Sequence, residues 1–451
     1  MSSISKKIIY GFEGFGGAEA ISCLKNVDWY GIGRYSKNID YDRNLLELYS
    51  FTESLPVAIK ETKLPLTLLA KFDSRLLVYF DQLSRTRSGR IGSPQENKNH
   101  ILTLLKWWYV KYHSKDIAWA FFAAPPHLGI DMVLSDYLEW EGVLVRWGSQ
   151  SLFSGYYQLL TTQLKTVAFS GNLPKKLPEL PECASEELFY MQNIKSNQPS
   201  KLKWLESCSK ALLGDKRYSL KWANYSYTDG IRYCKQLHQA TSDSIDTIEN
   251  LISNNVSFIY FPLHLQPEMT TSTLGGIYVD QALAIEHLHE KLPKEWKIVV
   301  KENPKQTFQC RPKSFFSRIK SLKNVEFVGL EANSKLLIKH SKVVSTITGT
   351  AGWEAIRFET PTVIFGKAWY EGFEGVYSFQ NEILIESIAR KKINRNRLES
   401  DYESFIKSCH YGVIDSGYQT LVDFEEGENI RYLTNLFDFL TEESKPTGHC
   451  Q

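Results

Sequence analysis

The chain has 451 residues, of which 43% are hydrophobic, 23% charged and 13% aromatic, and its formal net charge at pH 7 is +2. This length exceeds one ordinary core and predicts two large domains, while the composition excludes wholesale disorder and fibrous classes. The near-neutral charge lacks the strongly basic face of nucleic-acid-binding proteins, so we expect no nucleic-acid partner.

The cysteines and the N-terminal stretch indicate the cellular compartment of the protein. Seven cysteines are scattered along the chain without a Cys-x-x-Cys pair. That pattern fits a reducing environment and neither a disulfide framework nor a zinc site, so no metal ligands are predicted. The N-terminal stretch MSSISKKIIYGFEGFGG contains too short an apolar run for a signal peptide. We therefore expect a cytoplasmic protein.

The first half of the chain contains short apolar runs and loops that indicate an α/β domain, predicted over residues 1–250. Strands are expected at 6–12, 75–80, 116–124 and 142–147, and a helix at 130–141. The Pro- and Lys-rich string GNLPKKLPELPE begins an irregular insertion near 171–215. A helical stretch at 234–255 would carry the chain into the next domain.

The second half alternates strands and helices more regularly, over residues 251–430. Expected strands are 257–263, 297–301, 325–329, 342–347 and 361–366. Strand–helix alternation with short connections predicts a doubly wound parallel sheet covered on both faces. Residues 431–451 form a last helix and tail that could cross back. Two such domains would face a cleft at the carboxyl ends of their strands, where ligands bind.

The strand at 342–347 ends in small hydroxylated residues and glycine before a helix begins. This string contains Ser345, Thr346, Thr348, Gly349 and Thr350. Hydroxyl donors, free backbone N–H groups and a positive helix end at one point predict an anion site, most often for phosphate. A plain helix cap with a turn glycine is the alternative. Neither the dinucleotide glycine pattern nor a P-loop is present.

Two more groups extend this site. Glu354 lies one helical turn after the hydroxylated string and could accept a ribose hydroxyl, or it is an exposed helix acid. The strand at 297–301 runs directly into Lys301, Glu302, Asn303 and Pro304. Lys301 would point a charge into the cleft, or the string is an ordinary strand end.

The loop YFPLHLQPEMTTSTLGG follows the strand at 257–263. Gln266, Thr271 and Ser272 offer contacts to sugar or phosphate, and Glu268 offers a carboxylate for acid, base or nucleophile chemistry. We interpret His264 as a buried, hydrogen-bonded core histidine, although a ligand contact is the alternative.

In the first half, His127 and Asp131 follow a strand and begin a helix, where they could contact the second substrate. Arg90, in a basic loop, could contact an anionic acceptor, or the loop is a solvated segment.

Two basic clusters are solvated helix faces or, alternatively, anchors for anionic lipid head groups. The clusters are Lys313, Arg318, Lys320 and Lys323, and Arg390, Lys391, Lys392, Arg395 and Arg397.

The strings VKENP, RPKSFFSRI, STITGTAGWEAI and PTVIFGKAWY, in this order after YFPLHLQPEMTTSTLGG, resemble the capsular polysaccharide biosynthesis family, which includes β-Kdo transferases. The resemblance covers roughly residues 257–376. It implies a GT-B glycosyltransferase, with two Rossmann-like domains, a nucleotide-sugar donor on the C-terminal one and the acceptor on the N-terminal one.

The resemblance also implies roles for particular residues. Ser345, Thr346, Thr348, Gly349 and Thr350 would hold the donor phosphate, with Glu354 near the ribose. Asn303 occupies a position that is usually histidine in the family; it can donate a hydrogen bond but cannot carry charge. Glu268 is the first choice for the catalytic carboxylate, because Thr270 stands where a second acid is usual, and Asp131 is the second choice.

The predicted function is transfer of Kdo or a related acidic sugar from a CMP-activated donor to a surface polysaccharide or glycolipid. The helix end and Lys301 would stabilise the leaving phosphate, so no metal and no further cofactor is expected. The alternatives are a UDP- or GDP-sugar donor, nucleotide-sugar epimerisation, and a non-catalytic component of a capsule assembly machine. Peripheral association with the inner membrane stays open.

Overall fold

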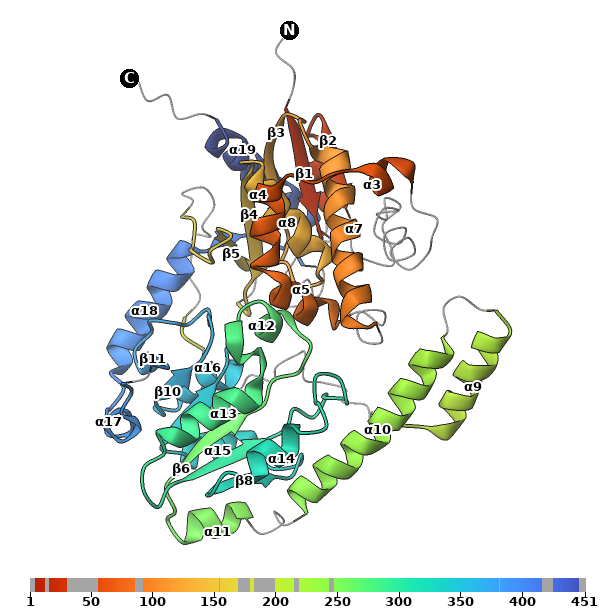
Figure 1. Ribbon diagram of the computed structural model, residues 1–451. Coiled ribbons are helices and arrows are strands. Elements are labelled where there is room, and N and C mark those ends of the chain that lie inside the picture. The colour runs from red at the N-terminus through yellow and green to blue at the C-terminus, as the bar shows by residue number, and fades with distance from the viewer. Residues whose placement is uncertain are drawn as a thin grey trace. The chain divides into compact units, whose positions relative to one another are not determined.

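The computed structural model describes residues 5–12, 16–30, 56–85, 92–153, 155–168, 179–181, 199–214, 219–242, 247–380, 382–415 and 425–445. The chain divides into two compact units, each with its own sheet (Figure 1). The N-terminal unit comprises Met1–Leu83, Gly92–Glu179 and Tyr402–Gln451, and the C-terminal unit comprises Ser84–Ile91 and Leu180–Asp401.

The N-terminal unit contains a six-stranded sheet in the order β12-β5-β4-β3-β1-β2. Strands β2, β1, β3 and β4 run parallel, and β5 and β12 pair antiparallel at one edge. The strands are β1 (Lys6–Tyr10), β2 (Val27–Tyr30), β3 (Ile117–Phe122), β4 (Leu144–Gln150), β5 (Tyr156–Leu160) and β12 (His410–Tyr411).

Helices cover both faces of this sheet because alternate strand residues point to opposite sides. Ile8 and Tyr10 pack with four helices on one face, whereas Ile9 packs with two helices on the other. The first face carries α4 (Leu66–Asp73), α5 (Leu76–Leu83), α7 (Pro94–Tyr112) and α8 (Ile130–Trp140), and the second α1 (Gly17–Ser22) and α19 (Glu426–Glu443). A short helix, α3 (Val57–Glu61), precedes α4.

The C-terminal unit contains a six-stranded, all-parallel sheet in the order β11-β10-β9-β6-β7-β8. In chain order this is 3-2-1-4-5-6, the arrangement of dinucleotide-binding sheets. The strands are β6 (Phe258–Pro262), β7 (Lys297–Lys301), β8 (Val325–Val328), β9 (Val343–Thr346), β10 (Thr362–Ile364) and β11 (Val376–Ser378).

Helices again lie on both faces of the C-terminal sheet. Ile259 and Phe261 face α10 (Leu220–Thr241), α13 (Gln281–Glu290), α14 (Phe315–Lys320) and α17 (Ile385–Ala389). Tyr260 and Val299 face α11 (Thr247–Ser253), α15 (Ser334–His340) and α16 (Thr350–Arg357). The predicted α/β class with two Rossmann-like, doubly wound domains is confirmed. The remaining helices are α9 (Lys201–Leu212), α12 (Met269–Ser272), the 3₁₀ helix η2 (Gly276–Val279) and α18 (Arg395–Ser408).

The division between the units differs from the predicted boundaries at 250 and 430. Residues 180–250 join the C-terminal unit because Tyr233 and Ala240 of α10 are buried in its core. Residues from Tyr402 onward join the N-terminal unit, where Phe437 of α19 stacks on Trp119. Most of the predicted insertion near 171–215 lies outside the described residues. No described helix combines the length and apolarity that a bilayer span requires.

The predicted strand at 75–80 is wrong, since these residues belong to α5. Tyr79 and Leu83 are both buried, and their spacing of four places them on one helical face. Five apolar residues in a row, Leu76 to Phe80, do not distinguish a buried helix from a buried strand. The Tyr79 hydroxyl donates to Asp136 at 2.6 Å, which fixes the helix against α8.

Candidate functional site

Two loops meet at the carboxyl ends of β6 and β9, the neighbouring strands at which the order of the C-terminal sheet reverses. Open α/β sheets bind their ligands at this point. His264 follows β6, and its Nε2 lies 2.8 Å from the Oγ1 of Thr346 at the end of β9. The backbone N–H of Thr348 donates to the same nitrogen at 3.3 Å. His264 therefore joins the two loops.

His264 is a neutral acceptor at this junction. The side chain is buried, and burial, followed by the charge of Arg311, lowers the pKa of His264 to about 4. The expectation of a buried, hydrogen-bonded histidine is confirmed. A Cβ at Gly349 would lie 3.0 Å from His264 Nε2 and 2.8 Å from Thr346 Oγ1. Glycine is needed here because the loop passes so close to the ring.

Two further segments complete this frame. The Thr348 hydroxyl donates to the carbonyl of Thr270 in α12 at 2.9 Å. The Tyr370 hydroxyl donates to the carbonyl of Gly349 at 2.5 Å, and the backbone N–H of Lys367 donates to the carbonyl of Leu274 at 2.9 Å. The strings that sequence reasoning grouped after β6, β9 and β10 thus come together at one edge of the sheet.

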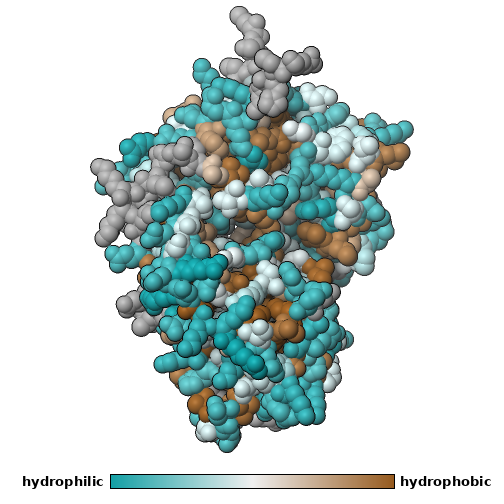
Figure 2. Space-filling model, turned by 90° about the vertical axis from the view of Figure 1, so that its left-hand side faces the viewer, coloured by the Kyte–Doolittle hydropathy of each residue, from teal (hydrophilic) through white to brown (hydrophobic). Residues whose placement is uncertain are grey.

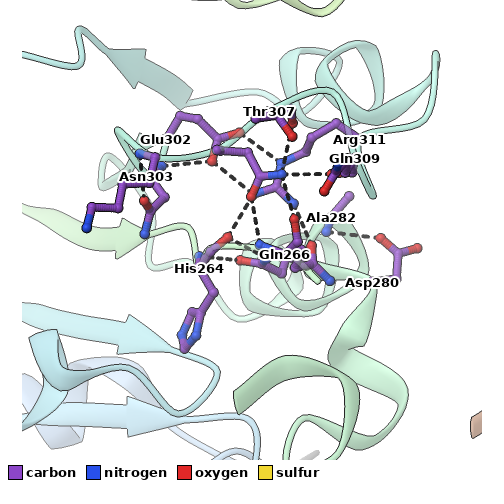
Figure 3. Close-up of polar contacts among 12 residues, drawn as sticks. His264, Gln266, Asp280, Ala282, Glu302, Asn303, Thr307, Gln309 and Arg311 are labelled. Carbon is purple, nitrogen blue, oxygen red and sulfur yellow. Dashed lines mark hydrogen bonds and ion pairs between the residues drawn. The ribbon is translucent and has the colours of Figure 1, made fainter. Parts of the chain in front are cut away.

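A buried ion pair holds the loop after β6 from the other side (Figure 3). Arg311 Nε donates to Glu302 at 2.8 Å, and both side chains are completely buried. Arg311 also donates to the Gln266 side-chain oxygen at 2.5 Å and to the His264 carbonyl at 3.0 Å. Burial lowers the pKa of Arg311, but the Glu302 carboxylate outweighs it, so the pKa is raised and the guanidinium is charged.

Two glutamines, Gln281 and Gln306, complete this network. The Gln281 side chain accepts the His264 N–H at 2.7 Å and donates to Gln266 at 2.7 Å. Gln306 accepts the Gln266 N–H at 2.8 Å. Every polar group of the loop backbone at these positions is therefore bonded inside the protein, which fixes the course of the chain toward Glu268. Sequence reasoning assigned no role to Arg311, Gln281 or Gln306; the one signal was that Arg311 begins RPKSFFSRI, a string of the family resemblance.

Several predicted donor-binding side chains are buried and hydrogen-bonded within the protein rather than presented to a ligand. Ser345 donates to the Val363 carbonyl at 3.4 Å, and Thr271 donates to the Glu268 carbonyl at 3.1 Å. Such bonds are common because hydroxyl groups in small loops often bond to nearby backbone, and the predicted role of these side chains in donor binding stays a prediction. The buried set is Gln266, Thr271, Ser272, Lys301, Ser345, Thr346 and Thr348.

Lys301 also differs from its predicted role. Its amino group donates to the Ala332 carbonyl at 2.6 Å and to the Ser334 hydroxyl at 2.9 Å, so it fastens the loop between β8 and α15. Burial lowers the pKa of Lys301, and the nearby Glu331 carboxylate opposes this effect. Lys301 therefore supports the sheet edge instead of pointing freely toward a phosphate.

Other predicted groups are at least partly exposed at the same edge. The Glu268 side chain is 40% exposed, and its carboxylate lies 3.4 Å from a guanidinium nitrogen of Arg85. Thr350 and Glu354, at the start of α16, and Asn303 are partly exposed as well. The Asn303 side-chain oxygen accepts the Lys305 N–H at 2.9 Å, as in a turn. The start of α16 carries the positive end of the helix dipole.

The predicted acceptor-side residues form a local cap. Asp131, at the start of α8, is buried and accepts backbone N–H groups of His127 at 2.9 Å, Leu128 at 2.8 Å and Met132 at 2.8 Å. These three bonds give Asp131 a structural role at the start of α8, and its catalytic role, the second choice, stays a prediction. The His127 ring lies 2.7 Å from the Pro125 carbonyl. Arg90 lies outside the described residues.

A large cavity of about 810 Å³ lies elsewhere, in the N-terminal unit. It is lined by the starts of β1, β3 and β4 and the end of α19, including Lys7, Asp116, Arg146 and Glu443. Parallel sheets bind ligands at the carboxyl ends of their strands, whereas this cavity lies at the amino ends. We therefore place the candidate site at the carboxyl ends of β6 and β9.

Within the described part of the chain, no three His, Cys, Asp or Glu side chains gather as a metal site would require. The sequence contains one Asp-x-Asp string, Asp40-Tyr41-Asp42, which lies outside the described residues. The predicted metal independence thus stays a prediction.

The C-terminal half of the chain is similar to a known protein family. Residues 216–409 match the family described as capsule polysaccharide biosynthesis protein, which confirms the resemblance inferred from the sequence. No curated protein sequence matches this chain.

Solved structures with partial likeness include β-Kdo transferase and epimerase domains. The β-Kdo 2,7 transferase of KpsC from Thermosulfurimonas dismutans has 13% identity and a TM-score of 0.31, covering 77% of this chain and 90% of its own. The UDP-GlcNAc 2-epimerase of Methanocaldococcus jannaschii has 10% identity and a TM-score of 0.25, covering 89% and 99%. These TM-scores are too low to carry an argument about function.

Proposed function

Because residues 216–409 carry the pattern of the capsule polysaccharide biosynthesis family, we propose that this chain is a glycosyltransferase of the GT-B class. It moves Kdo or a related acidic sugar from a CMP-activated donor to a surface polysaccharide or glycolipid. The observation that carries the proposal is the frame at the carboxyl ends of β6 and β9. There the start of α16 and the exposed Glu268 carboxylate belong to segments joined through Thr348 and Thr270.

The chemistry follows from these two features. The bond between the sugar's anomeric carbon and the phosphate oxygen of the nucleotide breaks, and an acceptor hydroxyl forms the new bond to that carbon. The positive end of α16 stabilises the charge on the leaving phosphate. Glu268 accepts the proton of the acceptor hydroxyl, and the Arg85 guanidinium, 3.4 Å away, orients this carboxylate.

The other residues act by holding these groups in place. His264 and the Glu302–Arg311 pair are buried, and they fix the two loops through bonds to the backbone. Fixed positions raise the rate because the reacting groups need no reorganisation when charge develops. Glu354 and Thr350, partly exposed on α16, are the groups we propose for ribose and phosphate contact.

Replacement of Glu268 by Gln tests the catalytic assignment. We expect donor turnover to fall by about 10²- to 10⁴-fold, because a positioned proton acceptor contributes that much, while nucleotide affinity changes less than about two-fold. Turnover would be measured as donor consumption and nucleotide affinity by calorimetry. Near-normal turnover would remove Glu268 from the catalytic role.

A thermal-shift panel of CMP, UDP and GDP tests the donor class. Stabilisation by CMP alone supports the proposed donor, whereas a response to UDP or GDP replaces it. No response to any nucleotide would favour a non-catalytic assembly component, and product formed without an acceptor would favour an epimerase. Turnover before and after chelation by EDTA decides whether a metal is needed.

A further inference from the structure

Helices α9 and α10 form a hairpin that extends from the C-terminal unit, with α9 beside the first half of α10 (Figure 1). The Trp204 indole donates to the Asn224 side chain at 2.9 Å and stacks on Tyr227 at 5.3 Å between ring centroids. The second half of α10 is anchored in the core of the unit through Tyr233. The inner side of α9 is therefore packed on α10.

The outer side of α9 exposes leucines. Leu202 is 79% exposed and Leu212 is 74% exposed, and Leu205 lies between them on the same helical face. Leu213, directly after the helix, is 86% exposed. No residue of α9 is buried. Single exposed leucines are normal in soluble proteins, but a row of them on one helix indicates a surface that contacts an apolar phase or partner.

Positive charge surrounds this leucine face. Lys201, Lys203 and Lys210 lie on α9, and Lys221 lies at the start of α10. The one acid of α9, Glu206, lies 2.5 Å from Lys210. Over residues 199–214 and 219–242 together, six side chains are Lys or Arg and two are Asp or Glu. Exposed leucines flanked by lysines are typical of helices that bind anionic bilayers.

The basic clusters singled out in the sequence differ from this surface. Arg318 pairs with Asp280 at 2.7 Å and with Glu286 at 2.8 Å. The second cluster is paired along its helices, as with Arg390 and Glu386 at 3.2 Å. Figure 2 shows the side that carries α17 and α18, where most residues are hydrophilic. Both clusters thus behave as solvated helix faces with acidic partners.

We propose that the α9–α10 hairpin docks on an anionic phospholipid surface. The leucine face of α9 enters the boundary between head groups and acyl chains, and the surrounding lysines contact lipid phosphates. This site is separate from the proposed reaction centre and does not depend on the identity of the donor. It would bring the chain to the surface where lipid-linked or membrane-proximal acceptors are found.

Cosedimentation of the full chain with vesicles tests the docking surface. We expect binding to vesicles of mixed phosphatidylglycerol and phosphatidylcholine, and at least about ten-fold weaker binding to pure phosphatidylcholine. The double variant Leu212→Glu/Leu213→Glu should bind the mixed vesicles at least about ten-fold more weakly, because it removes buried apolar area and adds negative charge. Lys201→Ala/Lys203→Ala should lose a similar factor and weaken the preference for phosphatidylglycerol.

Leu384→Glu is the matched control, because Leu384 is 71% exposed on the same unit but lies outside the hairpin. It should bind vesicles like the wild type, and all variants should melt like the wild type since the changed side chains are exposed. Equal binding by the Leu212/Leu213 variant and the wild type would overturn the proposal. A second result would also overturn it: the wild type fails to bind vesicles and forms a concentration-dependent dimer, and the Leu212/Leu213 variant is monomeric. The leucine face would then bind a second copy of the chain.

Discussion

The two carboxylates considered for catalysis have opposite environments. Asp131 is buried at the start of α8, and three backbone N–H groups within four residues bond to it. Glu268 is exposed at the start of α12, and its charged neighbour Arg85 is distant in sequence. Both follow strands of parallel sheets, so position along the chain does not separate them. The hydrogen bonds do, because Asp131 is buried and binds its own backbone, whereas the Glu268 carboxylate is partly exposed.

The two loops differ in the kind of partner that holds them. The loop before α8 is held by Asp131 close by and by neutral Gln82 of α5, which donates to the Pro126 carbonyl at 3.1 Å and accepts the Gly129 N–H at 3.2 Å. The loop after β6 is held by Gln281 and by the charged Arg311, whose ion pair with Glu302 is buried. Removal of one charge from that pair therefore separates the two kinds of support.

The largest effect is expected for Arg311→Met. This change leaves the Glu302 carboxylate buried without its ion-pair partner, and breaking such a pair costs about 3–5 kcal/mol. The melting temperature measured by calorimetry should fall strongly, and nucleotide binding should weaken because the loop after β6 loses two bonds. The double variant Arg311→Met/Glu302→Leu should recover much of the stability; a single variant that melts like the wild type would contradict the role of the pair.

A smaller effect, about 2 kcal/mol, is expected for Asp131→Asn, because charge-assisted hydrogen bonds to the backbone are lost. The new amide N–H₂ would face the His127 N–H in place of an accepting oxygen. Thermal unfolding should shift downward while the turnover of the remaining folded enzyme stays unchanged. Glu268→Gln should show the reverse pattern. If Asp131→Asn instead lost turnover without a loss of stability, Asp131 would be catalytic.

The pH dependence of stability isolates His264. Its pKa in the folded protein is about 4, below its ordinary value of 6.5, so the contribution is complete above pH 6.5 and is lost as the pH falls toward 4. Between pH 7 and pH 5 this loss lowers the free energy of unfolding by about 2 kcal/mol. The urea midpoint of the wild type should fall more over this interval than that of His264→Asn, whose amide does not titrate. Equal pH slopes would show that His264 is not held neutral.

The sequence reasoning and the structure differ most where side chains reach across the fold. Strand–helix alternation after residue 257 predicted β6 to β10 because each apolar run was bounded by loop residues and a helical stretch. The run at 75–80 failed because a short apolar stretch is compatible with either element. Ser345 and Lys301 were expected to face a ligand, but the sequence does not show that Val363 and Ala332 supply their partners.

By itself, the amino-acid sequence determined the α/β class, the order of strands and helices in the C-terminal unit and the loops of its candidate site, because periodicity and loop residues are local. The tertiary structure decided which of these polar residues face a ligand and which hold the loops. It also placed α19 on the N-terminal sheet and left the leucines of α9 uncovered by the described residues. Hydrogen bonding and burial depend on partners far along the chain, and only the folded arrangement brings those partners together.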